Sequence, residues 1–184
     1  MKRIILAVLS VLTVSTGVEA QSTAQIIENA LTAAPARGRA ATTVIRWNAD
    51  FTYETIQEGT SQMVCYDRSG ESGRAAFAVQ CTVLANLDRV AQNRRFDAEG
   101  GDAAGTRALV AAAEENGTRL AVQYGSVWLT MNGADRASAM THTTIAVPGA
   151  TMESLGGIPT SGRGSGAWLM NTGTDRAHIM VPGN

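Results

Sequence analysis

The two cysteines of the chain, Cys65 and Cys81, constrain its fold more than any other pair of residues. Each lies in an apolar, strand-like run (61–66 and 75–81), and turn-forming residues fill 67–74 between them. In an oxidising compartment the two should pair, closing a loop whose restriction stabilises the fold by ~3 kcal/mol. The spacing is not C-x-x-C, and two thiolates alone make a weak metal site. We therefore predict a structural disulfide rather than a redox or metal-binding pair.

The N-terminus supplies the reason to expect that compartment. Lys2 and Arg3 precede an apolar run at 4–14, and small residues lead up to Ala20. This pattern predicts a signal peptide over 1–20, cleaved after Ala20, and a periplasmic or secreted protein. The apolar run is shorter than the ~20 residues of a spanning helix, so we expect no membrane attachment after cleavage.

Composition narrows the class of protein further. The chain has 184 residues, is 45% hydrophobic and 17% charged, and carries a formal net charge of −1. These values are typical of one globular domain with a real core. A near-neutral balance argues against a nucleic-acid partner, which needs a clustered basic face.

The first part of the mature chain reads as a helix followed by strands. Ser22-x-x-Gln25 has the form of a capping box, and apolar residues at helical spacing predict a helix over 22–34. Residues 36–39 read as a linker, so 21–40 would form an N-terminal helix and linker. Residues 41–184 would form the exported domain. Four strand-like runs with short connections over 41–83 predict an antiparallel meander.

Residues 84–117 read as two helices. Gly100-Gly101 separates them, Asp102 can cap the second, and Asn116-Gly117 ends it. The pair Arg94-Arg95 has two interpretations, an anion site or a solvated helix face.

The last third returns to strands. The run 126–131 leads into Asn132-Gly133, a hairpin-turn signal, and 138–147 is the next strand. Glycines make 150–166 a long, flexible loop, and a final hairpin follows. The predicted fold is α+β: a single domain with a mainly antiparallel sheet from 41–83 and 126–182, and two inserted helices.

No phosphate loop, zinc-binding helix or nucleophile elbow is found, and we expect no cofactor and no metal. The two histidines, His142 and His178, precede similar Val-Pro-Gly segments with the same strand parity, so they should face one side. Each has a methionine two residues away, which suits a soft metal, although such methionines also fill cores. A Ser/Thr nucleophile with a histidine and Asp135 or Asp175 would instead satisfy triad logic.

A longer pattern covers the C-terminus. Trp168-x-Met170-x-x-Gly173-Thr174-x-x-Ala177-His178-Ile179-Met180-Val181-Pro182, an earlier block from Met131 to Ile145, and Val64-Cys65-Tyr66-Asp67 carry it. The chain resembles in these segments a loose group of exported bacterial proteins without an assigned activity. The resemblance spans 64–182 and draws attention to Asp135, His142, Trp168 and His178.

Two functions remain open from the sequence. The first is an exported domain that binds a small molecule or a protein without catalysis, in a pocket lined by Trp128, Trp168, His142 and His178 and covered by 150–166. The alternative is a metal-binding or hydrolytic enzyme that uses His142 and His178. The predicted ligand-binding residues are Asp135, His142, Trp168 and His178, and no catalytic residue is assigned.

Overall fold

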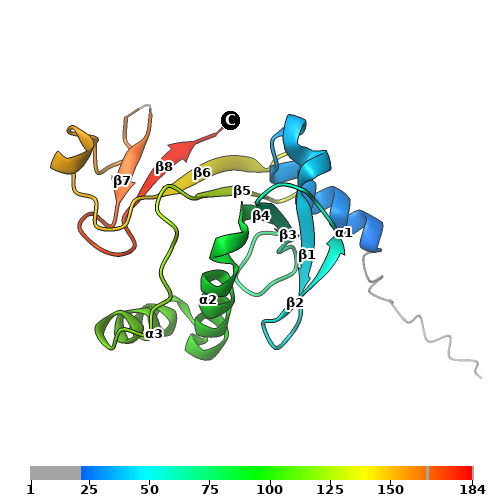
Figure 1. Ribbon diagram of the computed structural model, residues 1–184, viewed down its shortest axis with the longest axis horizontal. Helices are drawn as coiled ribbons and strands as arrows, with labels where there is room; N and C mark the ends of the chain where they lie inside the picture. Colours follow the sequence, from blue (N-terminus) through cyan, green and yellow to red (C-terminus); the bar gives the residue numbers. More distant parts are fainter. Residues whose placement is uncertain (1–21, 165, 184) are drawn as a thin grey trace, which may run out of the picture.

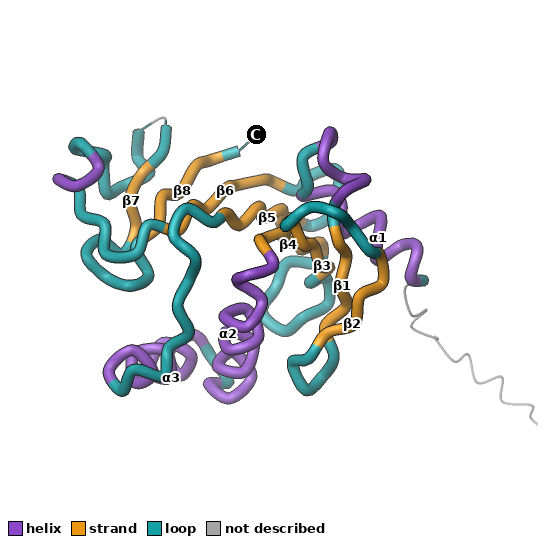
Figure 2. Tube along the Cα trace, viewed as in Figure 1, coloured by secondary structure: helices purple, strands orange, loops and turns teal. Residues whose placement is uncertain are grey.

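The computed structural model describes residues 22–164 and 166–183, so the predicted signal peptide lies outside it. Across the described residues, eight strands form one mostly antiparallel sheet in the order β2-β1-β3-β4-β5-β6-β8-β7 (Figure 1). The fold is α+β, as predicted, and two helices are inserted between β4 and β5 (Figure 2). The strands are β1 (Thr43–Trp47), β2 (Tyr53–Gln57), β3 (Met63–Asp67), β4 (Phe77–Val83), β5 (Val127–Gly133), β6 (Met140–Ala146), β7 (Trp168–Met170) and β8 (His178–Pro182). The helices are α1 (Thr23–Ala30), α2 (Leu87–Gly100) and α3 (Ala103–Glu115), with 3-10 turns η1 (Leu31–Ala33), η2 (Ala36–Ala41), η3 (Leu84–Asn86) and η4 (Glu153–Leu155).

The meander expected over 41–83 is wrong, because β1 and β3 run parallel. β2 folds back along one side of β1, and the chain then crosses the start of β1 to place β3 on its other side. At this crossing the Ser61 N–H donates to the Ala41 carbonyl at 2.8 Å. Gly59 allows the close approach, since a Cβ there would lie 2.4 Å from the carbonyl carbon of Thr42.

The predicted disulfide lies under α1. Cys65 of β3 and Cys81 of β4 are directly opposite each other and are bonded. Both are fully buried, in a core cluster with Val44, Ala30 and Ala34. The cross-link therefore joins two central strands where the N-terminal helix covers the sheet.

The N-terminal helix is shorter than predicted. Ser22 caps α1 by accepting a hydrogen bond from the Gln25 N–H at 3.2 Å, but the α-helix ends at Ala30 and continues as η1. Residues 36–39, expected as a linker, lie within the 3-10 helix η2.

α2 covers the opposite face of the sheet. Side chains alternate between faces along a strand, so Val64 and Tyr66 point away from the disulfide. Leu87 and Val90 of α2 pack against these two residues and against Ile45 of β1. The two helices predicted in 84–117 are confirmed, and both lie on this side of the sheet (Figure 1).

The corner between α2 and α3 is tight. Asp102 caps α3 by accepting hydrogen bonds from the N–H groups of Ala104 and Gly105, both at 2.8 Å. A Cβ on Gly105 would lie 2.1 Å from the Gly100 carbonyl oxygen, so the two helices meet where neither has a side chain. Gly105 thus has a packing role.

The β5–β6 hairpin turns later than Asn132-Gly133 predicts. Both residues lie in β5, where Asn132 pairs with Ala78 of β4 and with Met140 of β6. Pairing with β4 holds both residues in extended backbone, and the connection falls at 134–139 instead. The expected turn position is therefore wrong.

β7, β8 and the 147–164 segment pack on their own cluster at the far end of the sheet. Its core holds Val147, Ala150, Leu169 and Ala177. An ion pair of 3.9 Å from Arg89 of α2 to Asp175 ties this end to the helices. Within residues 22–164 and 166–183 no helix has the length and apolar character needed to cross a membrane.

Candidate functional site

The two histidines lie on one face of the sheet but do not meet. β6 and β8 are antiparallel neighbours, in which His142 is opposite Pro182 and His178 is opposite Ala146. Residues opposite each other share a face, so both imidazoles belong to the face that α2 covers elsewhere. Four positions separate them, about 13 Å along the strands at ~3.3 Å per residue. A shared metal or proton needs a much shorter separation.

The predicted binding residues mostly have local partners. The His178 Nδ1 atom is 2.8 Å from the Arg176 carbonyl oxygen. Asp135 accepts hydrogen bonds from the Ser138 N–H and hydroxyl, which lower the pKa of its carboxyl group. These contacts are typical of a strand end and a turn.

The two tryptophans of the predicted pocket are at opposite ends of a cross-strand row. Trp128 is opposite Thr144, Thr144 is opposite Met180, and Met180 is opposite Trp168. Neighbouring strands are ~4.8 Å apart, so the indoles belong to different parts of this face. Trp168 instead packs close to Gly162, where a Cβ would lie 3.0 Å from its ring. Among the described residues, no group of three or more His, Cys, Asp and Glu could hold a metal ion.

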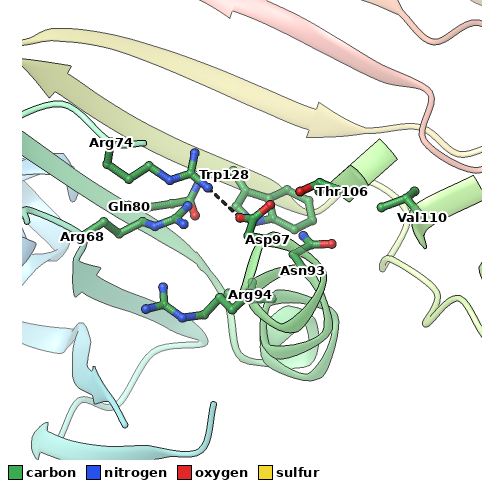
Figure 3. A pocket seen from close by; sticks show the side chains of 10 residues that line it. Arg68, Arg74, Gln80, Asn93, Arg94, Asp97, Thr106, Val110 and Trp128 are labelled. Atoms are coloured by element: carbon green, nitrogen blue, oxygen red, sulfur yellow. Dashed lines mark hydrogen bonds and ion pairs between the residues drawn. The ribbon is translucent and has the colours of Figure 1, made fainter. Parts of the chain in front are cut away.

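A different cavity lies between the sheet and the helix pair (Figure 3). Its volume is about 260 Å³. The β3–β4 region, α2, α3 and β5 all supply side chains to it. The described residues that line it are Arg68, Arg74, Gln80, Val90, Asn93, Arg94, Asp97, Thr106, Val110 and Trp128. We call it the inner cavity.

The loop after β3 is folded so that two arginines face this cavity. Asp67, the last residue of β3, accepts a hydrogen bond from the Ser69 N–H at 2.7 Å, and the Ser69 hydroxyl accepts from the Ala78 N–H at 3.1 Å. These contacts close the base of the 68–76 loop against β4. Arg68 and Arg74 then project from the loop, and Figure 3 shows their guanidinium groups pointing toward Asp97.

Three arginines share two carboxylates around the cavity. Glu71 accepts from Arg68 Nε at 2.9 Å and from Arg94 Nη2 at 2.6 Å, and Arg74 pairs with Asp97 at 2.9 Å. The Arg68 and Arg94 side chains are only 13% and 15% exposed. The cluster therefore keeps one positive charge in excess where solvent screens it weakly.

Several guanidinium donors of this cluster are unused. Within the described residues, the side-chain hydrogen bonds of Arg68 involve its Nε alone and those of Arg74 its Nη2 alone. Arg94 Nη1 is buried without a hydrogen-bond partner. Burial, and next the charge of Arg68, lower the pKa of Arg74. Each observation indicates a site with spare donors and unbalanced positive charge.

Two amides complete the polar lining. Gln80 accepts from the Tyr66 hydroxyl at 2.7 Å and donates to Thr130 Oγ1 at 3.2 Å, so its orientation is fixed. Asn93 Oδ1 accepts from Arg119 Nη2. Burial lowers the pKa of Arg119 to about 10. Because Oδ1 is engaged, the Nδ2 donor of Asn93 is left for the cavity.

A second, larger hollow of about 650 Å³ continues outward from the inner cavity. Arg68, Arg74, Arg94, Asp97 and Thr106 line both, so the arginines stand at their boundary. The outer part adds, among others, Phe51, Glu71, Asp102 and Arg107. A ligand can reach the arginines through this opening.

The lining of the inner cavity is rich in hydrogen-bond donors and in positive charge. Asp97 is the one carboxylate among its described lining residues, and it is paired with Arg74. That lining contains no histidine, serine or cysteine. Its hydroxyl group is that of Thr106, which donates to the Phe96 carbonyl oxygen at 3.4 Å. The donors and the positive charge of the arginines suit a carboxylate or phosphate.

Searches of protein-family models, of curated proteins and of solved structures gave no match to this chain. The resemblance to exported bacterial proteins therefore stays a prediction.

Two features of the sequence analysis bear on this site. Arg94-Arg95 was open to an anion site or a solvated face, and the structure separates the two residues: Arg94 lines the cavity and Arg95 is exposed. Arg68 and Arg74 belong to the stretch 67–74, where the sequence indicates a turn. Trp128 is the member of the predicted pocket that does line the cavity.

Proposed function

We propose that this protein is a non-catalytic binding domain for a small organic anion, whose carboxylate or phosphate lies against Arg68, Arg74 and Arg94. The observation that carries the proposal is the excess of three guanidinium groups over two carboxylates around one cavity. Arginine presents paired donors in a plane that matches both acid groups. The Arg68 and Arg94 side chains are weakly exposed, so solvent screens their attraction for an anion less.

The cellular setting is part of the proposal. The Cys65–Cys81 disulfide is compatible with an oxidising compartment, and the sequence of 1–20 has the features of a signal peptide. We place the domain in the periplasm or outside the cell, where it would capture its ligand. N-terminal sequencing of the protein from its native host should begin at Gln21. A mature protein that retains Met1 or Lys2 would contradict export by this route.

The binding test uses two adjacent arginines. Inorganic phosphate, benzoate and D-glucuronate are titrated by calorimetry into the wild type, Arg94→Gln and Arg95→Gln. At least one of these anions should bind the wild type, and Arg94→Gln should weaken it about ten-fold or more, since charged hydrogen bonds contribute ~1.5–3 kcal/mol. Arg95 is exposed, so Arg95→Gln controls for net charge and should leave the affinity within about two-fold.

Tryptophan fluorescence provides a second measurement of ligand binding. Trp47 lies under the Arg94 guanidinium and Trp128 lines the cavity, so binding should change intrinsic fluorescence. The change should persist in Trp168→Phe, because Trp168 is remote from the cavity lining. No binding by any of the three anions, or equal loss in Arg94→Gln and Arg95→Gln, would reject the proposed site.

A further inference from the structure

We infer that the ligand of the inner cavity is an anionic sugar, either a sugar acid or a sugar phosphate, whose hydroxylated ring lies between Asn93, Asp97 and Trp128. This inference rests on the proposed function and adds the chemistry of the ligand's body. The arginines recognise an acid group but do not distinguish one organic acid from another. The other residues that line the cavity do distinguish between organic acids.

The cavity offers both a donor and an acceptor beyond the arginines. Asn93 Nδ2 has no hydrogen-bond partner among the described residues, and Arg119 holds the amide with this donor available. Asp97 uses Oδ2 for Arg74, so within the described residues Oδ1 is an unused acceptor. A hydroxyl group both donates and accepts, and it is the ligand group that matches such a pair.

An alkyl or aryl acid would fit this lining poorly. Its body would cover Asn93 Nδ2 and Asp97 Oδ1 without pairing them, and covered polar groups without partners oppose binding. Sites built to hydrogen-bond a hydroxyl group reject analogues that lack it for the same reason. The lining therefore selects against plain hydrocarbon acids.

The apolar part of the lining suits one ring. Trp128, Val90 and Val110 lie among the polar groups, and an indole provides a rigid surface for the C–H groups of a sugar. The inner cavity of about 260 Å³ is just below the range of ~300–1,000 Å³ typical of pockets for drug-sized ligands. Its size fits a single six-membered ring with its substituents rather than a chain of sugars.

The test compares ligands that differ in the part of the molecule that carries the acid group, or in whether an acid group is present. D-Glucuronate, D-glucose 6-phosphate, benzoate, hexanoate and D-glucose are titrated into the wild-type mature chain. At least one anionic sugar should bind about ten-fold more tightly than benzoate and hexanoate. D-Glucose should bind far more weakly than either anionic sugar, because it lacks the acid group. The ratio of glucuronate to glucose 6-phosphate affinity identifies which acid group the arginines favour.

Two variants locate the sugar in the inner cavity. Asn93→Leu should weaken the anionic sugar about ten-fold while benzoate binding is unchanged, and that retained binding shows that the variant is folded. Asn93→Ala should act in the same direction. Arg107→Gln is the matched control, because Arg107 lines the outer hollow and not the inner cavity, and it should leave the sugar affinity within about two-fold.

The outcomes separate the two proposals. If benzoate or hexanoate binds as tightly as both anionic sugars, with loss in Arg94→Gln, the anion site stands and the sugar inference is wrong. If the anionic sugars bind but Asn93→Leu and Asn93→Ala have no effect, the ring lies elsewhere and the inference is again wrong. If no acid binds, the proposed function itself fails.

Discussion

The guanidinium group of Arg94 lies 5.0 Å from the centre of the Trp47 ring, while its Nη2 donates to Glu71 at 2.6 Å. An aromatic ring and a carboxylate thus fix one arginine from two directions. Both contacts join α2 to other parts of the fold, Trp47 from β1 and Glu71 from the β3–β4 loop. The cavity arginine is held in place before any ligand arrives.

Glu71 should compete with the ligand for this arginine. Glu71→Gln removes the negative charge and keeps an acceptor oxygen, so the cavity gains positive charge. We expect phosphate affinity to rise several-fold and the free energy of unfolding to fall by about 1–3 kcal/mol, because two weakly exposed arginines lose their charged partner. Calorimetry and urea unfolding measure the two effects. Glu99→Gln, at an exposed position of α2, is the control. A loss of phosphate affinity in Glu71→Gln would show that Glu71 positions the arginines more than it competes.

The disulfide should contribute strongly to stability. Cys65 and Cys81 are fully buried and link neighbouring central strands. Replacing both with alanine should lower the free energy of unfolding by ~2–5 kcal/mol, measured by urea unfolding. Reduced wild-type protein lacks the bond but keeps both sulfur atoms, so it controls for the volume that the alanine substitutions remove. Thiol titration of unreduced, denatured protein should find no free thiol, and two free thiols would contradict the bond.

Local signals explain what the sequence predicted well. The α2–α3 break at Gly100-Gly101 and the Asp102 cap depend on residues a few positions apart, and both occur as expected. The Cys65–Cys81 bond follows from there being only two cysteines. The cap and the break depend on contacts within a short segment, and the two cysteines have no other cysteine to pair with.

Tertiary contacts explain what it missed. Only the folded chain shows that Gly59 lies against the backbone at the start of β1. Asn132-Gly133 is a strong turn signal, but pairing with β4 overrides it. The arginines of the cavity come from a loop and from a helix, and the sequence contains no periodicity that joins Arg68 to Arg94. Their convergence is a property of the sheet and α2 together.

The crossing at Gly59 gives a direct test of the β1–β3 topology. Gly59→Ala places a methyl group 2.4 Å from backbone atoms, which cannot move aside as a flexible side chain can. We expect the free energy of unfolding to fall by about 1–3 kcal/mol or more. Gly38→Ala is the matched control, since a Cβ there has nothing within 4 Å. Equal stability of Gly59→Ala and Gly38→Ala in urea would be incompatible with the crossing.

His142 should make stability depend on pH without any partner histidine. Burial lowers the pKa of its imidazole below the ordinary value of 6.5. Above that value the histidine is neutral in both states and its contribution is fully present. As the pH falls through 6.5, the unfolded chain binds a proton that the folded chain resists, so stability decreases until the pH drops below the folded pKa.

The measurement is the free energy of unfolding of wild type and His142→Gln from about pH 8 to about pH 5. Carboxylates that titrate over the same range are present in both proteins, so the difference between the curves isolates His142. The wild type should lose stability relative to His142→Gln below pH 6.5, the ordinary histidine value, because glutamine does not titrate. Parallel curves would mean that His142 is hydrated in the folded protein as it is in the unfolded chain, and that the face of β6 on which it lies is open to water.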